Sequence, residues 1–152
     1  MDSFTYITVL LSIVLGLAIT QVILGFRGLI LTRVNVRLYG PTLIWAAIAL
    51  LLPIQAWWAD FSMRRQPNWT FFALMMILLH AISIYMFAAL VLPDISGENL
   101  VDLKEHFFAH RSWLFGAGLA SGVFSLSKTL TLYGHLPNLV DCAFEFTFWR
   151  VR

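Results

Sequence analysis

The stretch SFTYITVLLSIVLGLAITQVILGF, residues 3–26, decides the fold class, because its 24 residues include no Asp, Glu, Lys or Arg. A helix that crosses the roughly 30 Å hydrocarbon core of a bilayer needs about 20 apolar residues. Three later stretches are also of span length, so we expect four transmembrane helices at about residues 4–26, 39–59, 69–92 and 113–133. The sequence therefore predicts an all-α integral membrane protein with a single multi-span domain over residues 1–152.

The composition of the whole chain agrees with this class. Apolar residues make up 60% of the 152 residues and charged residues 12%, whereas soluble domains have roughly 45–50% and about 25%. A soluble globular fold and a disordered chain are both excluded. The longest run of basic residues is the pair Arg64–Arg65, so we expect no nucleic-acid partner. The single cysteine, Cys142, excludes an intramolecular disulfide.

Two shorter segments complete the expected fold. Residues 99–111 have the pattern of an amphipathic interfacial helix that Asn99 could cap. Residues 136–149 form a short apolar segment, with Asp141 and Glu145 four residues apart. Because this C-terminal segment is too short to cross a bilayer alone, we expect an interfacial or re-entrant helix there.

The loops predict an orientation. The loop over residues 27–37 carries three arginines, and the loop over residues 94–111 adds Lys104 and Arg111. If the spans alternate, these five basic residues lie on one side and three lie on the other. The positive-inside rule then places both loops in the cytoplasm and the N-terminus outside. We expect the protein in a membrane, most simply the bacterial cytoplasmic membrane.

Two helix faces are built from small residues. In lipid, helices associate through close backbone approach at such faces, so both stripes predict helix–helix contacts. The first stripe does not decide whether its partner helix belongs to this chain or to another. The two sets are Thr8, Ser12, Gly16 and Thr20 in the first span, and Gly118, Ser121, Gly122 and Ser125 in the fourth.

His80 falls near the middle of the third expected span, where an ionisable residue is a candidate functional site. Gln21, Gln55 and Lys128 are its candidate polar neighbours. Three interpretations stay open: a neutral histidine bonded to a neighbouring helix, a proton relay or polar transport site, and an axial ligand to a haem or chlorin. We expect Lys128 to reach the headgroups and Asp60 to be solvated just beyond the second span.

The loop over residues 94–111 carries a second candidate site. Asp102, His106 and His110 are spaced four residues apart, so a helix would place one carboxylate and two imidazoles on one face. This spacing suits a metal pair, but a face turned to water or headgroups has the same pattern, and two histidines could also sense pH.

The sequence shows no nucleophile constellation and no phosphate-binding glycine loop, so we expect a protein that is not an enzyme. The leading interpretation is an interaction or accessory subunit of a larger membrane complex. One alternative is a homo-oligomeric small channel or transporter with a polar path through the third and fourth spans. The other is a haem- or pigment-binding membrane subunit. Otherwise we expect no cofactor, and the expected partners are lipid and other membrane subunits or further copies of the chain.

Overall fold

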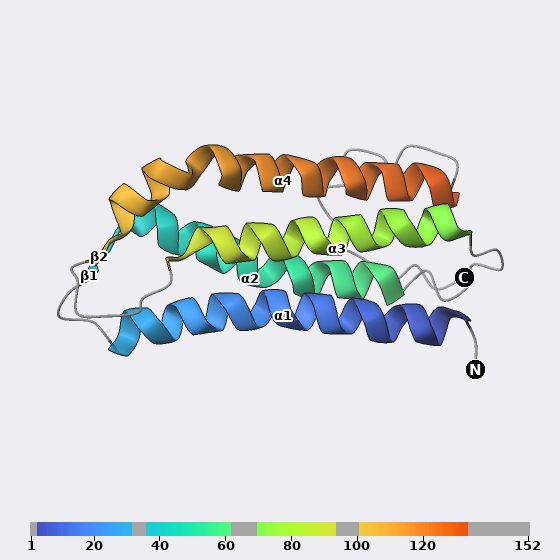
Figure 1. Ribbon diagram of the computed structural model, residues 1–152, viewed down its shortest axis with the longest axis horizontal. Helices are drawn as coiled ribbons and strands as arrows, with labels where there is room; N and C mark the ends of the chain where they lie inside the picture. Colours follow the sequence, from blue (N-terminus) through green and yellow to red (C-terminus); the bar gives the residue numbers. More distant parts are fainter. Residues whose placement is uncertain (1–2, 32–35, 62–69, 94–100, 134–152) are drawn as a thin grey trace, which may run out of the picture.

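A computed structural model of the chain describes residues 3–31, 36–61, 70–93 and 101–133. Within these ranges, helices that alternate in direction lie side by side, and two short strands pair at one end of the bundle (Figure 1). The elements are α1 (Ser3–Leu31), β1 (Val36–Arg37), α2 (Gly40–Phe61), α3 (Phe71–Val91), β2 (Val101–Asp102) and α4 (Leu103–Tyr133). The predicted all-α class is confirmed.

Three of the helices are long and apolar enough to cross a membrane, over Thr5–Leu31, Gly40–Asp60 and Phe71–Val91. The outward surface agrees with this, because large apolar side chains such as Ile13, Leu17 and Ile44 are exposed on it. A bundle folded in water would place polar side chains there. The fourth helix carries Lys128 and four serines and is less apolar than the others.

The expected division of the last part into an interfacial helix and a separate span is wrong. One helix, α4, runs without interruption from Leu103 to Tyr133. No proline or glycine separates Arg111 from Trp113, so nothing in the covalent chain ends the first segment before the second begins. The proposed cap Asn99 and the C-terminal segment 136–149 lie outside the described residues.

Each helix buries a seam whose residues recur at alternating spacings of four and three. This period of 3.5 is the pattern of left-handed helix packing, in which side chains of one helix fill the holes of the next. The seam residues of the first three helices are Leu11, Leu15, Ala18, Val22 and Leu29 in α1, Thr42, Ala46, Ala49, Pro53, Ala56 and Asp60 in α2, and Ala73, Ile77, His80, Ile84, Phe87 and Val91 in α3.

The same period continues through α4. Leu103, Leu114, Ser121 and Lys128 are buried, and half-buried residues such as His110 fill the positions between them. Asp60, His80 and Lys128 thus all stand at core positions of their helices. The heptad pattern, which directs apolar residues into the bundle, directs these three ionisable side chains inward as well.

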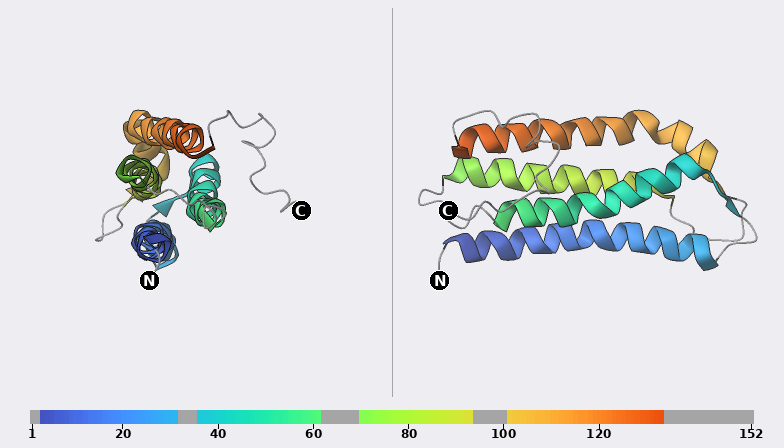
Figure 2. Two further views of the ribbon diagram at one scale, coloured as in Figure 1. Left: turned by 90° about the vertical axis from the view of Figure 1, so that its right-hand side faces the viewer. Right: turned by 180° about the vertical axis from the view of Figure 1, so that it is seen from behind.

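The central helix of the bundle is α3, which packs against α1, α2 and α4. Helices α2 and α4 touch each other much less, although an end-on view shows them on neighbouring sides of the bundle (Figure 2, left). Aromatic rings join these two helices near the strands, where Trp45 and Phe115 meet edge to face with ring centroids 5.3 Å apart. Their association at the opposite end rests on a polar contact.

The strands bear on the predicted topology. Val36 pairs with Val101 and Arg37 with Asp102 in a parallel register, so the chain just before α2 and the chain just before α4 meet at one end of the bundle (Figure 1). The alternation of helix direction that the sequence analysis assumed is confirmed within the described residues.

Candidate functional site

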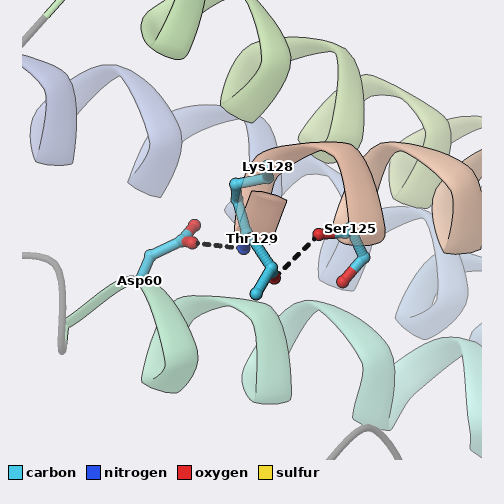
Figure 3. Close-up of polar contacts among 4 residues, drawn as sticks. All are labelled: Asp60, Ser125, Lys128 and Thr129. Atoms are coloured by element: carbon cyan, nitrogen blue, oxygen red, sulfur yellow. Dashed lines mark hydrogen bonds and ion pairs between the residues drawn. The ribbon is translucent and has the colours of Figure 1, made fainter. Parts of the chain in front are cut away.

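An ion pair between α2 and α4 is the principal polar feature of the bundle (Figure 3). The ammonium of Lys128 donates a hydrogen bond to Asp60, with 2.8 Å between Nζ and Oδ1. The side chain of Lys128 is 3% exposed and that of Asp60 is 12% exposed. The expectations that Asp60 is solvated and that Lys128 reaches the headgroups are therefore wrong, since each stands on the buried seam of its helix.

The two charges are costly to place there. Moving an ion out of water costs several kcal/mol even after relaxation, and the attraction between partners offsets this only when the geometry is good. Asp60 also stands next to the last residue of α2, where unpaired carbonyl groups disfavour a carboxylate. Apolar residues of similar size would hold α2 and α4 together at least as well. Buried ionisable residues in a membrane protein are candidate functional groups for this reason.

Small and hydroxylated residues of α4 surround the lysine. Ser121 is buried one heptad before it, and Ser125 and Thr129 are half-buried. The hydroxyl of Thr129 donates a hydrogen bond to the backbone carbonyl of Ser125 over 3.0 Å, so it is satisfied within its own helix (Figure 3). The short side chains leave room for the lysine to cross from α4 towards α2.

His80 lies deeper along the same interior. It is the tenth residue of α3, which places it about 14 Å from the start of that helix, and it is only 7% exposed. A Cβ on Gly118 would lie 3.5 Å from Phe87, so these residues of α4 and α3 lie at the same level of the bundle. Because the two helices are antiparallel, seven residues forward from Gly118 and seven residues back from Phe87 place Ser125 level with His80.

The two glutamines of the predicted polar site, Gln21 and Gln55, lie apart from the Asp60–Lys128 ion pair. The amide of Gln21 donates a hydrogen bond to the hydroxyl of Tyr85, with 3.4 Å between Nε2 and the oxygen. Gln55 is half-buried on α2. The structure thus brings Lys128 and Asp60 together with His80 nearby. A haem or chlorin at His80 would have to displace Ile77 and Ile84, which are fully buried one turn to either side.

The first predicted stripe of small residues faces out of the bundle. Ser12, Gly16 and Thr20 are exposed, and a Cβ built on Gly16 would meet nothing within 4 Å. The buried face of α1 is instead the heptad seam. The exposed hydroxyls have partners nearby: Thr20 donates to the carbonyl of Gly16 over 2.8 Å, and Ser12 accepts a hydrogen bond from the Trp57 indole over 3.3 Å.

The second stripe divides between the two sides of α4. Ser121 is buried, Gly118 and Ser125 are half-buried beside α3, and Gly122 is exposed with nothing within 4 Å of a Cβ. The stripe includes the adjacent residues Ser121 and Gly122, and two neighbouring residues of a helix cannot both face the same interface. Ser121 therefore lies on the buried seam and Gly122 lies outside it.

The second candidate site, made of Asp102, His106 and His110, forms local contacts instead of a metal site. Asp102 Oδ1 accepts hydrogen bonds from the backbone N–H groups of Lys104 at 2.8 Å and Glu105 at 3.4 Å, so it caps α4. The histidine rings stack with centroids 4.5 Å apart. His106 Nε2 donates to the carbonyl of Leu90, and His110 Nδ1 donates to the carbonyl of His106. Within the described part of the chain, no three His, Cys, Asp or Glu residues form a group that could hold a metal ion.

We expect His106 to make stability depend on pH. Burial lowers the pKa of His106 below its ordinary value near 6.5, the bond to Leu90 opposes this, and the charge of His110 lowers the pKa further. The unfolded chain therefore binds the proton more readily, so stability falls as pH drops below about 6.5. Unfolding in detergent should show a smaller loss between pH 7.5 and 5.5 for His106→Gln than for the wild type. An equal loss in both would contradict this assignment.

Asp60 was not predicted as a partner for Lys128. The signal was present in the spacing of Ala46, Ala49 and Ala56, which leads to Asp60 in steps of three, seven and four residues. Alanines carry little weight in a search for apolar stripes, although close helix packing in membranes uses such small residues. The distance of each charged residue from a span end does not show which face of the helix it occupies.

The fold and the buried pair define a class: an all-α protein whose apolar helices suit a membrane and whose interior carries charge. Comparison with models of known families, with curated proteins and with solved structures gives no match.

Proposed function

We propose that the protein is a membrane-embedded interaction subunit that binds a transmembrane helix of another subunit along the outward face of α1. The observation that supports this is the exposed stripe of Ser12, Gly16 and Thr20, where a Cβ on Gly16 would meet nothing within 4 Å. In lipid, a stripe of small residues favours close approach of a second helix.

The chemistry of the stripe supports the same proposal. Ser12 accepts a hydrogen bond from the Trp57 indole of α2, and Thr20 donates one to the carbonyl of Gly16. Neither hydroxyl therefore needs a polar partner from a second helix. A neighbouring helix could approach the backbone at Gly16 more closely than at any leucine or isoleucine. Dispersion contacts then favour association, since lipid tails compete poorly for a groove with small residues.

The orientation proposed with this function has the strand end of the bundle in the cytoplasm and the N-terminus outside. Exposed Arg27, Arg37, Lys104 and Arg111 at that end support it. We also propose that α4 crosses the membrane over about residues 113–133, beside α3. Burial of Lys128 against Asp60 supports this crossing, because a paired ammonium can lie where an unpaired one cannot.

The variant Gly16→Leu tests the proposed function. We expect it to fold like the wild type, because nothing lies within 4 Å of a Cβ at this position, and to lose its partner because leucine covers the stripe. Gly122→Leu is the matched control, since Gly122 is an equally open helical glycine on α4. The measurement is the native mass in mild detergent after purification from the protein's own membranes.

Three results are distinguishable. A wild-type mass that includes other polypeptides, lost in Gly16→Leu and kept in Gly122→Leu, supports the interaction subunit. A wild-type mass equal to a small multiple of 17.3 kDa, unchanged by Gly16→Leu, contradicts it and favours a homo-oligomeric channel or transporter. Loss of the partner in both variants would show that the α1 stripe has no special part in binding.

A further inference from the structure

We propose that the strand end of the bundle binds the headgroup of an anionic phospholipid, at a group of cations and aromatic rings beside β1 and the first turns of α4. We call this group the basic–aromatic cluster, and its members are Arg37, Tyr39, Lys104, Phe108 and Arg111. The ligand is a phosphodiester with one negative charge that stays attached to its acyl chains. This inference does not depend on the proposed interaction along α1, because no member of the cluster belongs to that helix.

Strand pairing and ring contacts bring the members of the cluster together. Arg37 pairs with Asp102, the residue directly before α4, so the strand carries Arg37 to the start of that helix. The rings of Tyr39 and Phe108 have centroids 6.4 Å apart. The guanidinium carbon of Arg111 lies 5.7 Å from the centroid of the Phe108 ring, within the range of a cation–π contact. The cluster therefore has a defined geometry and is more than a set of separate surface charges.

One stripe of α4 supplies most of the cluster. Lys104, Phe108 and Arg111 are four and three residues apart, so they share a face of the helix. Phe115 continues the stripe and meets Trp45 edge to face with centroids 5.3 Å apart, so the stripe follows the side of α4 next to α2. The rings of Phe108 and Phe115 are nearly half exposed. A phosphate at the cations thus has exposed aromatic rings beside it for the glycerol and the upper acyl chains.

The charge of the cluster indicates an anionic ligand. Arg37, Lys104 and Arg111 are exposed, and none of them forms an ion pair with a residue that the structure describes. The carboxylate of Asp102 is bound to the first backbone N–H groups of α4. Glu105 lies about a quarter turn around the helix from the stripe. The three cations therefore have no described counter-ion, which an anionic headgroup would supply.

The cluster also lies at the depth of the headgroups in the crossing proposed for residues 113–133. Helix α4 has 31 residues, which at 1.5 Å per residue makes it about 46 Å long, and the hydrocarbon core is only about 30 Å thick. The first turns of α4 therefore extend out of the hydrocarbon. Trp113 is 74% exposed two residues after Arg111, and tryptophan favours the interface between hydrocarbon and water.

The experiment measures lipid binding to the full-length protein in mild detergent by native mass spectrometry. Phosphatidylglycerol is titrated against phosphatidylcholine with the same acyl chains, and we expect the wild type to bind phosphatidylglycerol about tenfold more tightly or better. Arg37→Gln and Arg111→Gln should each weaken the binding of phosphatidylglycerol about fivefold, the contribution of one cation at a membrane surface. Arg111→Lys keeps the charge and should retain most of the affinity.

The matched control is Arg27→Gln, which removes an exposed cation of α1 at the same end of the bundle. An end-on view shows α1 and α4 on opposite sides (Figure 2, left), so this variant should bind phosphatidylglycerol as the wild type does. The four side chains that are changed are exposed, so every variant should unfold at the wild-type temperature in detergent without lipid. This second measurement separates a loss of binding from a failure to fold.

The outcomes decide between a site and general attraction. Affinity for phosphatidylglycerol that falls in Arg37→Gln and Arg111→Gln and stays in Arg27→Gln supports the proposal. A wild type with no preference for phosphatidylglycerol would overturn it. An equal loss in Arg27→Gln would overturn it as well, because the preference would then belong to the total charge of this end. Displacement of the lipid by glycerol 3-phosphate would identify a soluble phosphate as the ligand and would also contradict the proposed lipid site.

Discussion

Replacing Lys128 by methionine should destabilise the protein by about 3–5 kcal/mol, the largest effect expected of any single substitution considered. The variant keeps most of the length and apolar character of the side chain but leaves Asp60 without the ammonium that lies 2.8 Å from it. The carboxylate would then stand near the C-terminal end of α2 with no compensating charge, in an interior where the helix dipole also disfavours it.

The matched control is Lys104→Met, which removes a lysine from the exposed face of the same helix. Its stability should stay within about 0.5 kcal/mol of the wild type, as for most surface substitutions. The free energy of unfolding of both variants can be measured by denaturant titration in one detergent. Equal stability of Lys128→Met and Lys104→Met would mean that the buried pair contributes nothing to the folded state.

Gly25→Ala should also be strongly unfavourable, although it adds a single methyl group. A Cβ at Gly25 would lie 2.7 Å from Cδ1 and 2.8 Å from Cβ of Leu92, the C-cap residue that follows α3. The second atom is next to the backbone and cannot move out of the way by a change of rotamer. Helices α1 and α3 would have to part, and overpacking of this kind costs about 1–3 kcal/mol.

Gly16→Ala is the control for this prediction, because a Cβ there meets nothing within 4 Å. Alanine is the better helix former by about 0.5–1 kcal/mol, so this variant should be as stable as the wild type or slightly more stable. The two glycines are in the same helix, so opposite signs in one thermal-unfolding series would locate the contact between α1 and α3. A loss of stability at Gly16 as large as that at Gly25 would contradict the packing described.

The number and type of the main helices could be predicted from composition. Runs of about 20 residues without charge predict apolar helices regardless of how those helices pack, and three of the four expected spans correspond to α1, α2 and α3. The predicted boundary inside α4 is wrong, because the change from polar to apolar composition near Trp113 does not by itself end a helix. A helix needs a breaking residue or a cap to end, and the described chain has neither there.

The interior of the bundle was harder to predict, because an apolar helix in lipid gives no contrast between its two sides. Apolar side chains face both the bundle and its outer surface, so periodicity must be found in the small and polar residues. In α1 the small residues Ser12, Gly16 and Thr20 point outward, while Ala18 and Gly25 are the ones at the interface with its neighbours. The outward residues recur every four residues, whereas the residues at the interface follow the heptad period of the seam.

The contact between Asp60 and Lys128 joins residues 68 positions apart. Prediction of the pair needs the direction of each helix as well as its face, since both α2 and α4 end at the same end of the bundle (Figure 1). The alternation of the spans gives the direction of each helix, and the heptad seam gives the face that is buried. Without the seam, each charge close to a span end has a simpler interpretation as a solvated group.

The heptad seams of α2 and α4 turn Asp60 and Lys128 inward, where they meet each other. A double-mutant cycle with Asp60→Leu, Lys128→Met and the two combined tests it most directly, with the free energy of unfolding as the measured quantity. We predict that the combined variant is more stable than Lys128→Met alone, with a coupling of about 2–3 kcal/mol. Additive losses in the combined variant, with coupling near zero, would show that the two side chains do not interact in the folded protein.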